Sequence, residues 1–115
     1  MLLEEYRMAI VDVFEKHEIQ IVLYGSCARG YFNTDSDVDI LVLVDMTPEE
    51  MCCYRNKLYD MTYDFETKYG IEINPVVQCR KDYEQWKAVY PFYINIEREG
   101  IVIYGKETHN CTIHF

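Results

Sequence analysis

Two aspartates separated by one residue, Asp37 and Asp39, are the residues of this sequence best suited to chemistry. Side chains alternate along a β-strand, so both carboxylates are expected on one face, about 7 Å apart. Two carboxylates at that spacing can share one or two divalent cations. Asp39 also precedes the apolar run 40–44, against which an unpaired charge is costly. The pair therefore predicts a divalent-cation site.

Ten residues separate a glycine and a serine, Gly25 and Ser26, from this pair. Glycine lets the backbone approach a ligand closely, and the start of a following helix presents free N–H groups to a phosphate. The turn and the two aspartates together predict a site for a metal-bound nucleoside triphosphate.

Apolar periodicity and turn residues predict the elements that must position these groups. A β-branched strand over 19–24 is expected to end at Gly25, and Ser26 can cap a short helix after it. A second strand over 38–44 is almost entirely apolar, which is typical of a central strand.

A long helix has clear boundary signals. Thr47 is a good N-cap, Pro48 suits the first helical position, Glu50 completes a capping box and Gly70 is a stop, so the helix should extend to about Tyr69. The other expected elements are helices over 2–17, 81–90 and 91–98 and strands over 71–77 and 101–104, with Pro75 indicating an edge strand or a bulge. This order predicts an α/β (α+β) fold, a small mixed sheet with helices packed mainly on one face.

The composition limits the classes of function. The 115 residues are 50% apolar and carry a net charge of −9, which fits one domain and argues against general nucleic-acid binding. We expect a domain over 1–105 and a C-terminal tail over 106–115.

The longest aliphatic run, 40–44, is too short to cross a membrane. Glu4 and Glu5 stand where a secretory signal would carry basic residues. The five cysteines form no C-x-x-C pair, which favours a reduced, cytoplasmic compartment.

The motif G-S-x10-D-x-D, in a strand–turn–helix–loop–strand setting, resembles the signature of the nucleotidyltransferase superfamily related to DNA polymerase beta. The run 25–30 and the modest length resemble its smallest branch, the minimal nucleotidyltransferases (MNT), which are commonly found beside HEPN-domain toxins. The resemblance covers most of the chain, because the segment 96–105 also resembles the closing helix and strand of that branch.

The resemblance implies a role for each residue of the motif. Asp37 and Asp39 would hold Mg²⁺, Ser26 and the backbone at Gly25 would bind the β- and γ-phosphates, and Arg29 would add positive charge. A hydroxyl would attack the α-phosphorus of a nucleoside triphosphate, with ATP as the favoured substrate, and pyrophosphate would leave.

The family usually carries a third carboxylate on a later strand, and the matching segment here is 71–77. Glu72 and Asn74 share a face of that strand by the two-residue period. Glu72 is our candidate for the third carboxylate and catalytic base. Asn74 is the alternative occupant, and as an amide it would be a neutral replacement.

The resemblance implies a Mg²⁺-dependent transfer of a nucleoside monophosphate to a hydroxyl, with a HEPN-type toxin as acceptor and the chain as its antitoxin. The alternative is a catalytically weak or inactive fold that neutralises the toxin by direct binding. Transfer to a small molecule is a third, weaker interpretation, because such relatives generally use a further domain. The sequence leaves the oligomeric state open.

Overall fold

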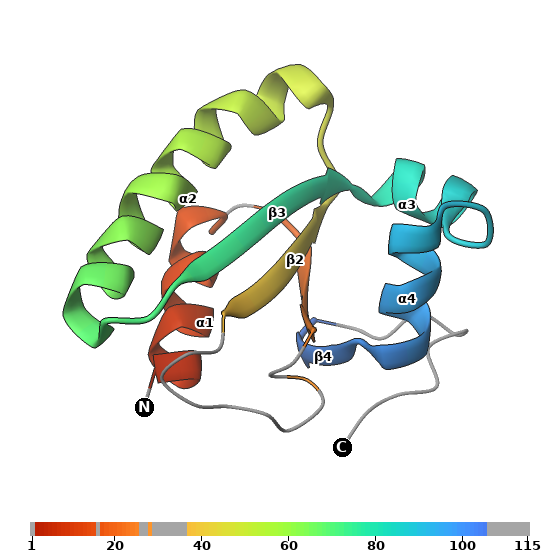
Figure 1. Cartoon of the computed structure of the whole chain (residues 1–115). Coiled ribbons are helices and arrows are strands. Elements are labelled where there is room, and N and C mark those ends of the chain that lie inside the picture. The colour runs from red at the N-terminus through yellow and green to blue at the C-terminus, as the bar shows by residue number, and fades with distance from the viewer. Residues whose placement is uncertain (1, 16, 26–27, 29–36, 106–115) are drawn as a thin grey trace.

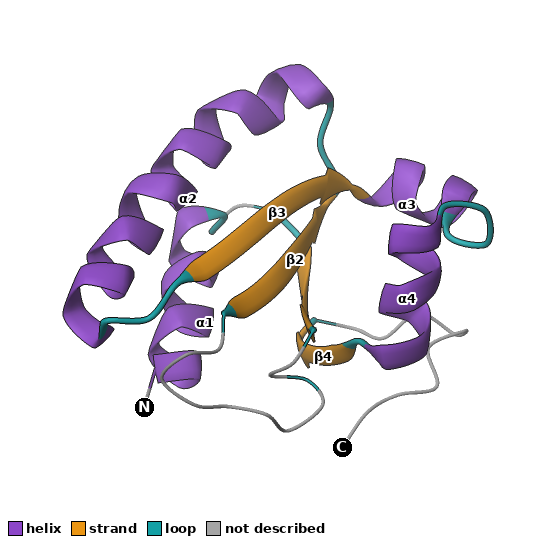
Figure 2. Ribbon diagram, in the orientation of Figure 1, coloured by secondary structure: helices purple, strands orange, loops and turns teal. Residues whose placement is uncertain are grey.

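The chain folds into a mixed four-stranded sheet with helices on both faces, as the computed structural model shows (Figures 1 and 2). The structure describes residues 2–15, 17–25, 28 and 37–105. Along the described chain the elements are α1 (Leu2–Val13), β1 (Ile19–Tyr24), β2 (Val38–Val44), α2 (Pro48–Tyr69), β3 (Ile73–Cys79), α3 (Arg80–Trp86), α4 (Pro91–Glu99) and β4 (Ile101–Tyr104). The predicted cap at Ser26 and the predicted tail 106–115 lie outside the described residues.

The strand order is β3-β2-β1-β4, so β2 is central and β3 lies at an edge. β1 pairs antiparallel with β2 and with β4, whereas β2 and β3 run parallel. The mixed sheet is therefore confirmed, as are the central position of 38–44 and the edge position that Pro75 indicated.

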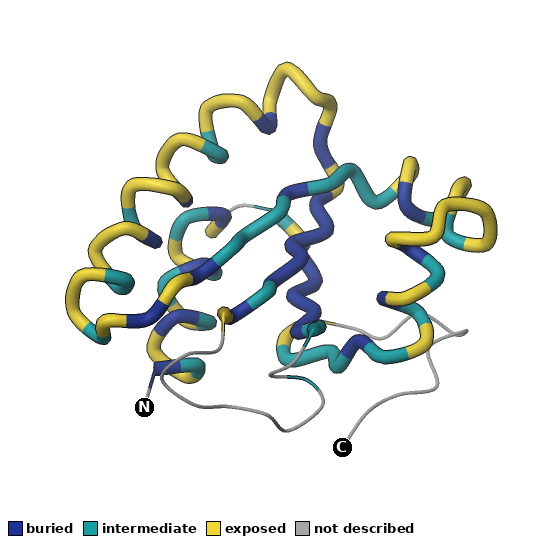
Figure 3. The backbone as a smooth tube through the Cα atoms, in the orientation of Figure 1, coloured by how far each residue is buried: buried dark blue, intermediate teal, exposed yellow. Residues whose placement is uncertain are grey.

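The two faces of β2 are both buried, which explains its continuous apolar sequence. Val38, Ile40, Val42 and Val44 face the core beneath α1 and α2. Leu41 and Leu43 belong to a second, smaller core beneath α3 and α4. Figure 3 shows β2 as a mostly buried strand between these helix layers. The two longer helices, α1 and α2, thus lie on one face of the sheet as expected, and the shorter helices α3 and α4 cover the other face.

Helix α2 begins and ends where its sequence signals predict. The Thr47 side chain accepts a hydrogen bond from the Glu50 N–H, and a Glu50 carboxylate oxygen accepts one from the Thr47 N–H, which completes the capping box. Gly70 ends the helix in the left-handed conformation, with φ 65°.

Other boundaries differ from the predictions by a few residues. β3 extends over Ile73–Cys79 rather than 71–77, because its parallel register with β2 spans Val38–Val44. Glu72 therefore precedes the strand, although its backbone carbonyl accepts a hydrogen bond from the Val38 N–H at 2.9 Å. Helix α1 ends at Val13 instead of residue 17, and α3 ends at Trp86 instead of residue 90.

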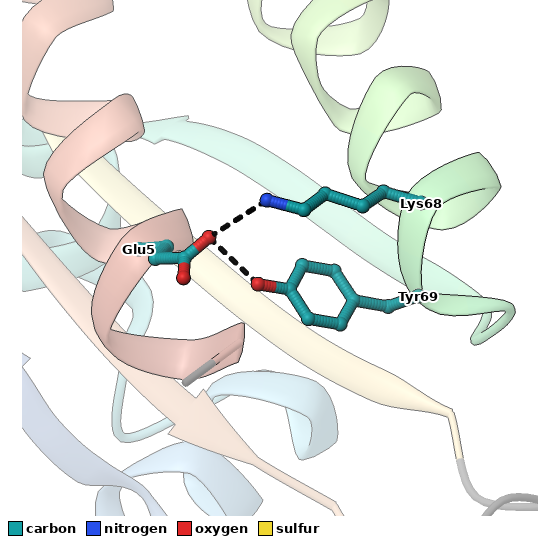
Figure 4. A network of polar contacts seen from close by, with 3 residues as sticks. All are labelled: Glu5, Lys68 and Tyr69. Carbon is teal, nitrogen blue, oxygen red and sulfur yellow. Dashed lines mark hydrogen bonds and ion pairs between the residues drawn. The ribbon is translucent and has the colours of Figure 1, made fainter.

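Helices α1 and α2 are joined by polar contacts as well as by apolar packing. The buried Tyr6 and Thr62 hydroxyls lie 2.6 Å apart in a hydrogen bond. At the surface, Glu5 accepts hydrogen bonds from Tyr69 at 2.6 Å and from Lys68 at 3.3 Å (Figure 4). The Tyr69 hydrogen bond and then that of Lys68 lower the pKa of Glu5 from 4.5 to about 2.

None of the helices in the described part of the chain is long and apolar enough to cross a membrane.

Candidate functional site

Asp39 is the centre of the candidate site. It lies on β2, opposite Tyr24 of β1 in the antiparallel register and opposite Asn74 of β3 in the parallel register. Side chains at paired positions share a face of the sheet, so these three groups are neighbours on the face that α3 and α4 cover. The Asp39 side chain is half-buried between them.

Asn74 makes the direct contact with this carboxylate. Its Nδ2 donates a hydrogen bond to Asp39 Oδ1 at 3.2 Å. The amide holds the carboxylate in a fixed orientation. Of the two residues that the sequence left as alternatives for this strand, Asn74 is the one that meets Asp39.

Glu72 lies at a different level of the sheet. In the parallel register each β2 residue lies opposite the β3 residue 35 positions later, as Asp39 lies opposite Asn74. Continued two residues back along both segments, this register places Glu72 opposite Asp37. Both residues are exposed, and both stand just before their strands. Glu72 is therefore placed nearer the first aspartate than the second, and its catalytic role stays a prediction.

Gly25 brings the turn after β1 against Asp39. Its φ of 77° is left-handed, a conformation that other residues rarely adopt. A Cβ at this position would also collide with Asp39 Oδ2. Only glycine lets the turn backbone and the carboxylate come this close, so the structure brings together the two halves of the motif that the sequence predicted.

Tyr24 is a neighbour of the site that the sequence reasoning missed. Burial, and then the charge of Asp39, raise the pKa of Tyr24 to about 12. The phenol therefore keeps its proton at neutral pH. The signal in the sequence was its position directly before the Gly25 turn, on a strand expected beside that of Asp39.

Ser26 and Arg29 lie outside the described residues. Ala28, which stands between them, is partly buried against the core beneath α1 and α2. Within the described ranges no group of three or more His, Cys, Asp or Glu side chains is arranged to hold a metal ion. The described donors are the carboxylates of Asp37 and Asp39, and such oxygen donors fit a hard cation like Mg²⁺ with water and phosphate completing its shell.

Comparisons with known proteins agree with this geometry. Residues 7–104 match the family model described as the nucleotidyltransferase domain. A relative from Methanocaldococcus jannaschii, named "Putative protein adenylyltransferase MJ1305", is 30% identical over 106 residues, which cover 92% of this chain and 71% of that protein. A second protein of the same organism, given the same name with the designation MJ0604, is 29% identical over 89% of this chain and 94% of its own length.

Two solved structures share the fold. A toxin–antitoxin structure with AMP-PNP has a TM-score of 0.60 and 18% identity, covering 93% of this chain and 77% of that chain. A mutant of the toxin–antitoxin MntA-HpeT has a TM-score of 0.57 and 16% identity, covering 93% and 76%. The resemblance of the motif to polymerase-beta-like enzymes is confirmed, and the chain belongs to the nucleotidyltransferase domain family.

Proposed function

We propose that the chain transfers an adenylyl group from ATP to a hydroxyl group of a partner protein. The observation that carries this proposal is the half-buried Asp39 carboxylate, held between the Gly25 turn and the Asn74 amide. Asp37 stands two residues earlier, directly before β2, so both carboxylates can act on one ligand.

The reaction is an in-line attack of the acceptor hydroxyl on the α-phosphorus, with pyrophosphate as the leaving group. Asp37 and Asp39 would hold Mg²⁺, which stabilises the charge on the attacking and leaving oxygens. The backbone at Gly25, with Ser26, binds the β- and γ-phosphates, and Arg29 adds positive charge there. The Asn74 amide keeps Asp39 oriented but cannot accept a proton, so Glu72 is the proposed base.

The nature of the acceptor is suggested by the relatives. Two of them are named as protein adenylyltransferases, and the structural neighbours are toxin–antitoxin complexes. We therefore propose a HEPN-type toxin as the acceptor and an antitoxin role for this chain. The net charge of −9 favours association with a basic, RNA-handling partner. We place the reaction in the cytoplasm.

The test is incubation of the purified chain with Mg²⁺, each α-³²P-labelled nucleoside triphosphate and the toxin encoded beside it. Label should appear on the toxin with ATP and be lost in the Asp37→Asn/Asp39→Asn variant. An Asp60→Asn/Asp64→Asn variant, which removes two exposed carboxylates from α2, is the matched control and should label the toxin normally. Absence of label with every nucleotide would contradict the proposal.

One observation favours a second candidate, neutralisation of the toxin by binding alone. Asn74, not a carboxylate, stands in register with Asp39, and a site without a base loses about 10²–10⁴-fold in rate. Under this alternative the Asp37→Asn/Asp39→Asn variant would still suppress the toxin and still co-purify with it. Loss of suppression with co-purification retained would instead identify the chemistry as the antitoxin activity.

A further inference from the structure

The exposed aromatic ring of Phe92 contacts Tyr24, which is the neighbour of Asp39 on β1. Tyr24, opposite Asp39 in the register, is met edge-to-face by Phe92, with ring centroids 5.5 Å apart and an interplanar angle of 85°. Phe92 belongs to the first turn of α4, and the residue is 40% exposed. An apolar ring is thus presented to solvent beside the proposed metal-binding carboxylates.

The position of this ring is fixed by the packing of α4. Tyr93 and Ile96 are buried in one cluster with Val22, and α4 leads directly into β4, whose Ile101 pairs with Leu23 of β1. In Figure 1 α4 lies on the opposite side of the sheet from α1 and α2. Tyr93 also packs against the Phe92 ring, at 5.8 Å between centroids. Phe92 is therefore held in place although it is exposed.

We propose that Phe92, backed by Tyr24, is the surface on which the nucleobase of the bound nucleotide stacks. The inference rests on the proposed function, because it takes the phosphates to lie at the Gly25 turn and the aspartates. The nucleobase is then the planar, apolar part of the substrate that needs a partner near this end of the sheet. Stacking on an aromatic side chain serves any base, since every base has a π-face.

The ring at position 92 differs from the other exposed aromatic side chains of the described residues. The rings of Trp86 and Tyr90 stack on each other with centroids 5.4 Å apart, and Tyr63 on α2 is a 68% exposed residue. Tyr24 is the link to Asp39, and the exposed ring in contact with Tyr24 is that of Phe92. This contact singles out Phe92 as the residue that could touch the nucleotide.

Two ligands separate contact with the base from contact with the phosphates. Binding of ATP and of inorganic tripolyphosphate, each with Mg²⁺, is measured by calorimetry on the full chain and on Phe92→Ala and Phe92→Leu. We expect both variants to bind ATP about 5- to 150-fold more weakly and to bind tripolyphosphate within about twofold of the unmodified chain. Phe92→Trp should retain the ATP affinity. Tyr63→Ala is the matched control, because it removes an exposed ring from α2, and it should change neither affinity.

Several results would overturn the inference while leaving the proposed function intact. The first is an unchanged ATP affinity in both variants. The second is an equal loss of affinity for ATP and for tripolyphosphate. The third is an unmodified chain that binds the two ligands with equal affinity. Loss of toxin labelling with normal ATP affinity would assign Phe92 to the protein acceptor and equally reject a base contact. An unmodified chain that binds neither ligand would reject the proposed function and this inference together. Phe92→Leu preserves most of the apolar volume, so the comparison does not depend on Phe92→Ala folding normally.

Discussion

The Nδ2 atom of Asn74 donates a hydrogen bond to Oδ1 of Asp39 across the parallel pair β2–β3. An amide therefore lies beside the half-buried Asp39, where a further carboxylate would repel it unless a cation lay between them. This contact orients Asp39 without metal. It also leaves the deprotonation of the acceptor hydroxyl to another group, for which Glu72 is our candidate.

Asn74→Asp is expected to raise the rate of adenylyl transfer in the presence of Mg²⁺, by up to about 10²-fold, because it places a proton acceptor beside Asp39. Without Mg²⁺ the same variant should be less stable by about 1.5–3 kcal/mol, since it loses a hydrogen bond to a charged group and gains a repulsion. Transfer assays and thermal unfolding with and without Mg²⁺ measure both effects.

Asn56→Asp adds the same charge at an exposed position of α2 and controls for the change in net charge. A Mg²⁺-independent drop in stability, with no gain in rate, would show that position 74 does not face the metal. A loss of transfer in Glu72→Gln, alongside that result, would leave Glu72 as the base.

Gly25→Ala is expected to destabilise the chain more than Gly70→Ala. Both glycines have a left-handed φ, so each substitution costs about 1–2 kcal/mol of backbone strain. At Gly70 nothing lies within 4 Å of an added Cβ, whereas at Gly25 it collides with Asp39, which adds about 1–3 kcal/mol. Urea unfolding gives the two free energies, and ATP titration should show a loss of affinity for Gly25→Ala alone. Equal unfolding energies would mean that the turn does not press against Asp39.

Glu5→Gln is expected to lower the free energy of unfolding at neutral pH, because Glu5 accepts hydrogen bonds from Tyr69 and Lys68. The pKa of Glu5 is lowered from 4.5 to about 2 in the folded state, so its stabilisation is present above pH 4.5 and disappears as the pH falls toward 2. Urea unfolding of the two proteins at a series of pH values should show curves that converge on the acid side. Glu4→Gln, which removes the neighbouring exposed charge, is the control; a difference that persists at pH 2 would refute the assignment.

Tyr6→Phe is expected to cost about 1–3 kcal/mol of unfolding free energy, because it leaves the buried Thr62 hydroxyl without its partner. The double variant Tyr6→Phe/Thr62→Val should lose less unfolding free energy than the sum of the two single changes, and a double-mutant cycle measures that coupling.

Burial raises the pKa of Tyr6 to about 12, so Tyr6 should also contribute to loss of stability as the pH rises from 10 to 12. Tyr63→Phe, at a 68% exposed position, should change neither quantity.

Much of the site could be predicted from local sequence. The Gly25 turn and the carboxylate at Asp39 are adjacent in the structure as the motif indicated, and the capping signals placed α2 correctly. The capping signals act within the end turns of α2, and the Gly25–Asp39 contact joins two strands that follow one another in the chain and pair directly. The positions of Tyr24 and Phe92 were not predicted, because the contact between them depends on how α4 packs on the sheet.

The tertiary structure alone decided which of Glu72 and Asn74 stands in register with Asp39. The two residues differ by two positions, and a slip of two residues along a strand leaves every side chain on the same face. The apolar pattern of the sequence is equally satisfied by either alignment. The hydrogen-bond register between β2 and β3, which joins residues 35 positions apart, sets Asn74 against Asp39 and leaves Glu72 before the strand.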